Sequence, residues 1–268
     1  MKLSKHIPEA FNLDGELLPL AGGQNTSVKI NNAVLKPVDD EPHFEWLLNI
    51  IDKIVPEGYR LSKPIRSTDG TFVSHGWVCT RFERGHEARG KIEEKLRVSR
   101  LFHRDLSGVN VQDFPRPDHA WSKAHQIAWQ AKELPEDIHK EARDMIINLL
   151  RKVSLLQRYN LQVVHGDLSG NILFDDTLEP LVIDFSPTVA PVEYAEAILA
   201  CDCIAWQGSP VSEIDLLPDS ELYKEMITRA VIFRLTVAAI GSGQDYDAFM
   251  REYTAFQPIV DKLREWGK

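Results

Sequence analysis

The chain has 268 residues, of which 43% are hydrophobic and 26% charged, and its formal net charge at pH 7 is −9. This length and composition suffice for a substantial core in one large domain or in two lobes. The excess of acidic side chains argues against a general nucleic-acid binder, because such proteins need clustered Lys and Arg to displace counterions from phosphates.

Membrane and disulfide signals are weak throughout the sequence. No apolar run reaches the roughly 18 residues of a membrane helix, and the first residues contain no hydrophobic signal region. Cys79, Cys201 and Cys203 are an odd set without C-x-x-C spacing, which indicates neither a disulfide framework nor a zinc site. We therefore expect a cytoplasmic protein with no membrane association.

The first 40 residues alternate between short apolar runs and polar breaks. A short helix is expected at 5–13, and the runs at 16–20, 28–30 and 33–35 predict successive β-hairpins. The first break contains Gly22, Gly23, Asn25, Thr26 and Ser27. Paired glycines let a backbone approach a phosphate closely, and the neighbouring side chains add hydroxyl and amide groups. Gly-Gly is also common in ordinary hairpins, so this loop alone is a weak signal of phosphate binding.

The next strand ends in a lysine and is followed by a helix that carries acidic residues. The run Ala-Val-Leu-Lys, ending at Lys36, is similar to the third-strand V-A-I-K of kinases, in which the Lys reaches the nucleotide phosphates and a Glu from the next helix holds it. Apolar residues recur at helical spacing from Phe44 to Ile54, and they predict that helix with Pro42 in its first turn. Glu45 is the expected partner of Lys36, with Glu41 as the second choice. No Walker A sequence competes for the phosphates.

A change of pattern near residue 84 predicts a boundary between two lobes. Runs at 59–66 and 71–74 flank Asp69-Gly70, a strong hairpin turn, and a further extended run covers 77–82. After Glu83-Arg84-Gly85 the apolar residues recur at helical spacing. The helices are expected at 91–106, 119–133, 136–159, 192–206, 221–240 and 246–266. We expect an N-terminal lobe at 1–84 and a helical C-terminal lobe at 85–268.

One segment matches a catalytic motif in letters but not in context. Residues 103–110, His-Arg-Asp-Leu-Ser-Gly-Val-Asn, fit the protein-kinase catalytic-loop pattern H-R-D-L-x-x-x-N. They lie at the end of the predicted helix 91–106, no apolar strand pair follows, and Asp113-Phe114 comes only three residues after Asn110. We interpret this segment as a helix end that runs into a Pro-rich loop.

The stretch 163–185 contains a more convincing arrangement of oxygen ligands. Apolar runs at 171–174 and 181–185, separated by a polar turn, predict a β-hairpin. Asp167, Asn171 and Asp184 lie at its ends and supply the oxygen donors that Mg²⁺ prefers. A purely structural Asp-Asn network is the alternative. Asp202 is an acid in the otherwise apolar helix 192–206. It either anchors this loop or contacts substrate, and helix capping, surface exposure or pairing in the core explain it equally well.

His165-Gly166-Asp167-Leu168, then Asn171, then Ile183-Asp184-Phe185 resembles the catalytic core of the aminoglycoside phosphotransferase and choline kinase group of small-molecule kinases. The resemblance implies an α+β, two-lobe protein-kinase-like fold, with a small β-rich N-lobe and a larger helical C-lobe. It also implies transfer of the γ-phosphoryl group of ATP, or another nucleoside triphosphate, to a hydroxyl of a small molecule with the help of Mg²⁺. The family usually has four residues between its catalytic Asp and Asn. Here there are three, and Ser169 is an alternative to Asn171.

The resemblance assigns a role to each candidate residue. Asp167 would orient the acceptor hydroxyl and accept its proton, and Asn171 and Asp184 would hold Mg²⁺. Lys36 would position the phosphates beneath the loop that contains the paired glycines. The adenine ring would bind the backbone of the hinge between the lobes, near Thr80 and Phe82.

The sequence leaves the acceptor and the degree of activity open. From Ser186 onward the chain has 13 acidic and 7 basic side chains, which either favour a cationic acceptor by long-range attraction or form an ordinary solvated face. One alternative function is a catalytically weak, nucleotide-binding pseudokinase that regulates a partner, which the short loop motivates. Another is a metal-dependent phosphoester hydrolase using His165, Asp167 and Asp184, which lacks the further ligands of a two-metal site.

Overall fold

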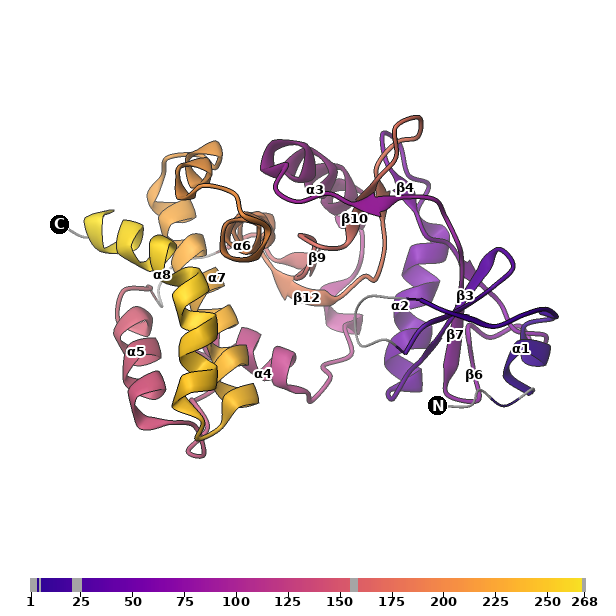
Figure 1. The fold of residues 1–268 in the computed structure, drawn as a ribbon, viewed down its shortest axis with the longest axis horizontal. Coiled ribbons are helices and arrows are strands. Elements are labelled where there is room, and N and C mark those ends of the chain that lie inside the picture. Colours follow the sequence, from indigo (N-terminus) through magenta and orange to yellow (C-terminus); the bar gives the residue numbers. More distant parts are fainter. Residues whose placement is uncertain (1–3, 5, 21–25, 155–158, 267–268) are drawn as a thin grey trace. The chain divides into compact units, whose positions relative to one another are not determined.

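The computed structural model describes residues 4, 6–20, 26–154 and 159–266, and the chain divides into two compact units (Figure 1). The β-rich unit consists of Met1–His86 together with Leu173–Phe185, and the helical unit consists of Glu87–Ile172 and Ser186–Lys268. The architecture is mixed α and β, as expected. Leu173–Phe185 therefore belongs to the same compact unit as the N-terminal residues, although it is distant from them in sequence.

The main sheet of the β-rich unit is antiparallel and is assembled from short hairpins. Its strand order is β1-β2-β3-β7-β5, and β6 pairs with β7. The bounds are β1 Leu18–Pro19, β2 Val28–Ile30, β3 Ala33–Pro37, β5 Pro64–Ile65, β6 Val73–Ser74 and β7 Trp77–Arg81. Side chains alternate along each strand, so Ala33, Leu35 and Cys79 pack into one core with Ile7 and Phe11, which belong to or adjoin α1 (His6–Ala10).

Helix α2 (Glu41–Lys53) begins where its sequence predicts. Asp40 is the N-cap, and its Oδ1 accepts a hydrogen bond of 3.0 Å from the His43 N–H, while Pro42 occupies the first turn. Its buried face includes Leu47, Leu48 and Ile51.

A second sheet positions the end of the predicted metal-binding hairpin. Its strand order is β4-β11-β10-β8. The bounds are β4 Arg60–Leu61, β8 His86–Glu87, β10 Ile172–Phe174 and β11 Leu181–Val182. Strand β11 runs parallel to β4, with Leu181 opposite Arg60, and the Ser62 N–H donates to Val182 O at 3.1 Å. Asp184 lies just after this fixed strand.

The helical unit is built around two helices that are buried on most of their sides. Helices α6 (Val192–Gln207) and α7 (Glu221–Ser242) pack against each other, and α7 also packs against α4 and α8 (Figure 1). The remaining bounds are α3 Ile92–Leu106, η1 Val111–Asp113, α4 Ala120–Ala128, α5 Lys140–Leu150, η2 Val211–Leu216 and α8 Tyr246–Trp266. Strands β9 (Gln162–His165) and β12 (Pro187–Ala190) form an antiparallel pair.

Two helices are shorter than the sequence predicts. The helix expected at 119–133 ends at Ala128, because Gln130 adopts a left-handed backbone conformation with φ of 56°. The helix expected at 136–159 covers only Lys140–Leu150, and residues 155–158 lie outside the described part of the chain.

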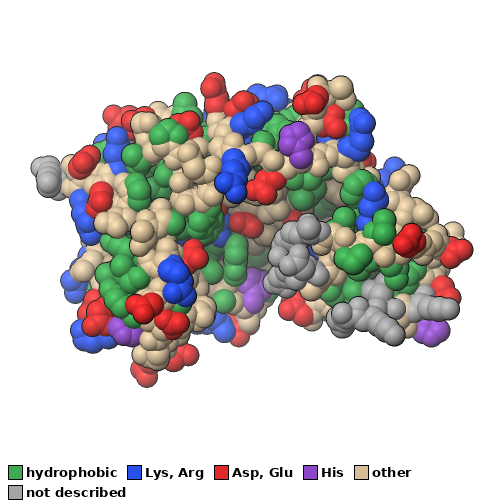
Figure 2. Space-filling model, in the orientation of Figure 1, with side chains coloured by type: hydrophobic (Ala, Val, Ile, Leu, Met, Phe, Trp, Pro, Cys, Tyr) green, Lys and Arg blue, Asp and Glu red, His purple; other side chains and the backbone are tan. Residues whose placement is uncertain are grey.

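On one face of the molecule, charge is spread over the surface rather than concentrated (Figure 2). On the face drawn in Figure 2, acidic side chains of the helical unit are interspersed with basic and hydrophobic ones. None of the helices that the structure describes is long and apolar enough to cross a membrane.

Candidate active site

The predicted catalytic loop follows β9 and is held by backbone contacts on both sides. His165 lies opposite Pro187 in the β9–β12 ladder, and the Gly166 N–H donates to Ser186 O at 2.9 Å. A Cβ atom on Gly166 would lie only 3.0 Å from His125 Nε2. Glycine is therefore required here, because it lets the loop pass the buried imidazole of His125.

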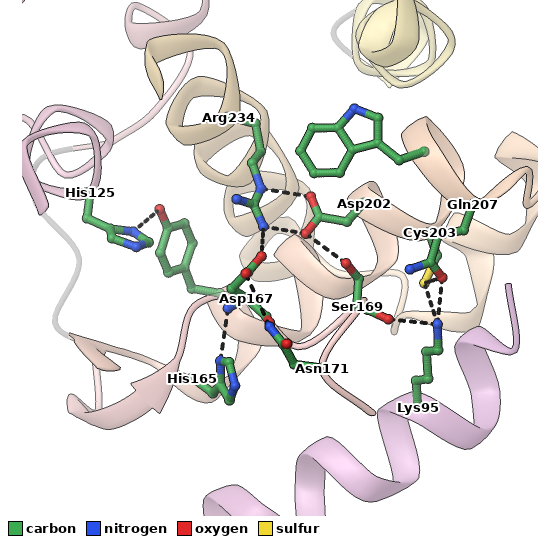
Figure 3. Close-up of polar contacts among 12 residues, drawn as sticks. Lys95, His125, His165, Asp167, Ser169, Asn171, Asp202, Cys203, Gln207 and Arg234 are labelled. Atoms are coloured by element: carbon green, nitrogen blue, oxygen red, sulfur yellow. Dashed lines mark hydrogen bonds and ion pairs between the residues drawn. The ribbon is translucent and has the colours of Figure 1, made fainter. Parts of the chain in front are cut away.

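Asp167 and Asn171 are brought together across the short loop. Asn171 Nδ2 donates to Asp167 O at 2.6 Å and to Asp167 Oδ2 at 3.2 Å, and the Asp167 N–H donates to His165 Nδ1 at 3.1 Å (Figure 3). Among the described residues, nothing donates a hydrogen bond to Asn171 Oδ1. The spacing of three residues thus closes a compact loop and leaves a carbonyl oxygen available to a cation.

Arg234 of α7 joins this loop to Asp202 of α6. Its Nη2 donates to Asp167 Oδ1 at 2.7 Å and also to Asp202 Oδ2, while its Nε donates to Asp202 Oδ1 at 2.8 Å (Figure 3). Asp202 is fully buried and Arg234 is 3% exposed, whereas the Asp167 side chain is 28% exposed. Asp202 is therefore paired in the core and anchors the loop through Arg234.

Burial and charge compete in this cluster. Burial raises the pKa of the Asp202 carboxyl to about 6, although the charge of Arg234 opposes the shift. Burial alone would lower the pKa of Arg234, but the charges of Asp202 and Asp167 outweigh it and raise that pKa. Arg234 is consequently a permanent cation in direct contact with Asp167.

Ser169, the alternative to Asn171, is held from two directions. Its hydroxyl donates to Asp202 Oδ2 at 3.3 Å, and its carbonyl oxygen accepts from Lys95 Nζ at 2.8 Å. Lys95, on α3, is fully buried and also donates to Gln207 Oε1 at 2.5 Å. Burial lowers the pKa of its ammonium. The Ser169 side chain is thus directed to Asp202, and Lys95 fixes its backbone.

In the β-rich unit the structure brings Lys36 to Asp184. Lys36 Nζ lies 2.5 Å from Asp184 Oδ1, although the two residues are 148 positions apart. Their side chains are 35% and 50% exposed, so a ligand can reach them. Asp184 has a φ of 47°, a left-handed conformation that costs most non-glycine residues energy and that Asp tolerates better than they do.

The expected pairing of Lys36 with Glu45 is not the one found. Glu45 Oε2 instead accepts from the backbone N–H groups of Phe72 and Val73, at 2.8 and 3.0 Å. Phe72 precedes β6 and Val73 is its first residue, so Glu45 satisfies backbone donors at the start of this strand. A role for Glu45 in nucleotide binding stays a prediction.

The other predicted nucleotide contacts are only partly covered by the structure. Gly22, Gly23 and Asn25 lie outside the described residues; Thr26 is exposed and Ser27 half-buried, just before β2. Thr80 lies on β7 opposite Val34. The Phe82 N–H donates to Asn32 O at 2.8 Å, so an adenine that binds this amide must replace that bond.

The donor set suits Mg²⁺ better than a transition metal. Within the described ranges no three His, Cys, Asp or Glu side chains form a metal-binding group. Mg²⁺ is commonly bound through one or two protein oxygens together with substrate phosphates and water. The exposed carboxylate of Asp184 and the Oδ1 of Asn171 each fit that requirement within their own unit.

The segment 103–110 has a structural role, in agreement with its interpretation as a helix end. His103 is fully buried, and its Nε2 accepts a 3.0 Å hydrogen bond from the His165 N–H. Burial lowers the pKa of His103 to about 3. Asp105 Oδ1 accepts from the neighbouring Arg104 Nε, and Asn110 caps η1.

Sequence reasoning missed Arg234 and Lys95. The signal in the sequence is the same for both. Each is a basic residue on the apolar, buried face of its helix. A buried cation normally needs a buried anion or several acceptors. For Arg234 that anion is Asp202, which already stands out in the sequence.

Comparison with known proteins identifies the fold. A family model of the RIO domain matches residues 122–206, and no curated protein matches the sequence. The apo form of a thermostable mutant of aminoglycoside phosphotransferase APH(4)-Ia is similar with a TM-score of 0.60 and 11% identity, over 95% of this chain and 98% of that one. Choline kinase LicA from Streptococcus pneumoniae gives 0.61 and 11%, over 97% of both chains. The GDP complex of aminoglycoside 2'-phosphotransferase-IIIa gives 0.57 and 15%, over 90% and 91%.

These similarities confirm the expected fold. The chain has the protein-kinase-like fold that small-molecule phosphotransferases use, and the RIO domain match is to another kinase-like family. Solved structures with this fold include complexes with ADP, AMP and GDP.

Proposed function

We propose that the protein is an ATP- and Mg²⁺-dependent phosphotransferase that transfers the γ-phosphoryl group to a hydroxyl of a small molecule. The observation that carries the proposal is the 2.5 Å pair of Lys36 and Asp184, which links the predicted phosphate-binding lysine to the predicted metal ligand. The compact loop that holds Asp167 against Asn171 supports it independently.

The residues have few covalent tasks in such a reaction, so positioning and charge neutralisation dominate the rate. Asp167 orients the acceptor hydroxyl and takes its proton. The hydroxyl oxygen forms the new bond to the γ-phosphorus while the bond to the bridging oxygen breaks, and ADP leaves with that electron pair. Lys36 holds the phosphates in line.

Mg²⁺, when bound by Asn171 and Asp184, neutralises charge on the phosphates. We infer that Asp184 is kept accessible for this purpose, since half of its side-chain surface is exposed. The pair with Lys36 preorganises the carboxylate, and phosphate oxygens then give Lys36 a second set of anionic partners.

The test is the thermal unfolding midpoint of the wild type and of Asp184→Asn, with and without saturating ATP and Mg²⁺. A ligand at about 100 times its dissociation constant stabilises a protein by about 2.7 kcal/mol, a shift of a few degrees at this size. Asn is the chosen substitution because it tolerates the left-handed backbone at this position. We expect the metal-dependent shift to disappear in the variant.

Asp176→Asn is the matched control, because Asp176 is an exposed acid in the turn between β10 and β11. It should keep the full shift. If no nucleoside triphosphate raises the midpoint of the wild type, the phosphotransferase proposal is wrong. Binding without turnover across a broad set of acceptors would instead support the regulatory pseudokinase that the short loop motivated.

A further inference from the structure

The guanidinium of Arg234 uses only one of its edges within the protein. Nε and Nη2 face Asp202, and Nη2 also contacts Asp167. Because the group is planar and rigid, Nη1 lies on the opposite edge and points away from the Asp202 carboxylate (Figure 3). In the described part of the chain Nη1 makes no hydrogen bond. It is also not sealed from solvent.

Arg234 is only 3% exposed, so the acceptor for Nη1 must be water or a ligand that reaches this side chain. The unpaired edge belongs to the same side chain that contacts Asp167, whose carboxylate is 28% exposed. A hydrogen-bond donor and a hydrogen-bond acceptor are therefore presented side by side next to the predicted point of phosphoryl transfer.

Two indole rings flank the guanidinium. The ring centroids of Trp121 and Trp206 lie 4.8 and 5.1 Å from Arg234 Cζ. Trp206 remains 46% exposed, and its Nε1 donates to Glu252 Oε2 at 3.3 Å. A partly exposed indole next to fixed polar groups provides apolar surface for a ring, with hydrogen-bond partners at its margin.

The charges around the guanidinium bear on the charge of the ligand. The permanent charge of Arg234 disfavours an ammonium group at Nη1 by like-charge repulsion. The carboxylates of Asp167, Asp202 and Glu252 outnumber that cation and disfavour an anion. Among the titratable groups next to Arg234, burial lowers the pKa of His125 to about 3 and raises the pKa of Tyr194 and of Cys201, so these three are uncharged at neutral pH. A neutral ligand meets neither penalty.

We propose that Arg234 is a specificity-determining residue and that the acceptor is a neutral compound with two adjacent hydroxyl groups, a sugar or a polyol. One hydroxyl donates to Asp167 and is the one that reacts, while its neighbour accepts from Arg234 Nη1. A hydroxyl both donates and accepts, so this pair of contacts satisfies the unpaired edge. The reactive role rests on the proposed function, whereas the binding preference does not.

The experiment measures binding without nucleotide, by ligand-observed NMR, to probes of three charge classes. The neutral probes are glucose, myo-inositol and the matched pair 1,2-cyclohexanediol and cyclohexanol, the cationic ones choline and glucosamine, and the anionic ones glycerate and glucose 6-phosphate. We expect the tightest binding for a neutral diol. Cyclohexanol, which lacks the neighbouring hydroxyl and so leaves Nη1 without a ligand partner, should bind at least tenfold more weakly than 1,2-cyclohexanediol.

Arg234→Lys keeps the charge but loses the planar edge, so it should reduce the difference between 1,2-cyclohexanediol and cyclohexanol to less than threefold. Arg229→Lys is the matched control, because Arg229 lies on the same helix, is 1% exposed and pairs with Glu225 rather than with Asp167. It should lower the unfolding midpoint similarly and leave the preference intact. Should Arg234→Lys not fold, the charge-balanced Arg234→Gln/Asp202→Asn variant takes its place.

Three results would overturn the inference. They are tightest binding of a cationic or anionic probe, no binding of any probe, or an unchanged preference in the Arg234 variant. A failure of the proposed function is a different outcome. Absence of a nucleotide-dependent thermal shift would remove the phosphotransferase and leave a neutral-diol site that the NMR titrations still establish.

Discussion

Two segments of the helical unit share the pattern His-x-Asp-Leu followed by Asn, and they do different things. In residues 103–110 the pattern lies at the end of α3, where successive side chains are about 100° apart around the axis. His103 points into the core, while the Asp105 carboxylate accepts from its neighbour Arg104. In residues 165–171 the pattern follows a strand, and the loop turns the Asp167 N–H back to the His165 ring.

The difference shows that the backbone setting, not the letters, brings the functional groups together. The first segment nevertheless supports the second. His103 accepts from the His165 N–H, and Gln162 Nε2 donates to His103 O at 2.8 Å. The helix end therefore holds the strand that leads into the predicted catalytic loop.

The largest expected effect separates the two aspartates. Asp167→Asn removes the carboxylate that we propose accepts the hydroxyl proton, and general-base catalysis contributes about 10²- to 10⁴-fold. We expect kcat to fall by that factor and the unfolding midpoint to change little. Asp105→Asn changes a half-buried acid at the end of α3 that lies outside the predicted catalytic loop, so it should keep kcat within about twofold of the wild type. Comparable losses in steady-state assays of both variants would contradict the assignment.

The sequence predicted much of the fold because local patterns determine it. Helices α3, α6, α7 and α8 fall close to their expected bounds, and the strands around Lys36 match the predicted hairpins. The helix predicted at 119–133 was too long. The apolar periodicity continues past Ala128, but the left-handed backbone conformation of Gln130 cannot continue the helix. Apolar spacing does not encode such a local break.

The site was less predictable because its contacts join distant residues. Lys36 and Asp184 were both expected near the phosphates, but the pairing with Glu45 was wrong, since the amides of Phe72 and Val73 compete for that carboxylate. Arg234 reaches Asp167 across 67 positions, and no short motif carries that information. The contact depends on the packing of α6 against α7.

The second prediction concerns the structural histidine. His103→Ala removes the acceptor of the His165 N–H and leaves a buried donor unpaired, which costs about 1 to 3 kcal/mol, with a further contribution from the cavity. We expect the free energy of unfolding in urea to fall by about 2 to 3 kcal/mol. His6→Ala, at a histidine whose side chain is 81% exposed, should change it by less than about 0.5 kcal/mol. Equal effects would mean that His103 does not support β9.

The third prediction concerns Lys95, which anchors the loop at residues 165–171. Lys95→Met keeps the buried volume but removes the donor to Ser169 O, so the loop that carries Asp167 is less well fixed. Small misplacements of catalytic groups cost up to about 10²-fold, and we expect kcat to fall about tenfold with KM for ATP unchanged. Lys140→Met, at an exposed lysine on α5, should leave both constants unchanged. A rise in KM for ATP alone would place Lys95 in nucleotide binding instead.

The smallest expected effect is a pH dependence of the free energy of unfolding that comes from two buried histidines, His103 and His125. Burial lowers the pKa of His103 and of His125 to about 3 in the folded protein, against an ordinary value near 6.5. Below about pH 6.5 the unfolded chain therefore binds protons at these two histidines, whereas the folded protein does not bind them until the pH approaches 3. Stability from these two groups is fully present above pH 6.5 and is lost as the pH falls towards 3.

Asp202 acts in the opposite direction, because burial raises its pKa to about 6 in the folded protein. Its contribution is fully present below about pH 4 and is lost as the pH rises through 6, so it partly offsets one histidine in that window. Comparing the wild type with His103→Gln cancels this offset, which both proteins share. Between pH 7 and 5 the unfolding free energy of the wild type should fall more steeply, by up to about 1.4 kcal/mol per pH unit. Parallel pH profiles in urea titrations would show that His103 binds its proton equally well in the folded protein and in the unfolded chain. His103 would then not be the buried, uncharged histidine that distinguishes the helix end from the predicted catalytic loop.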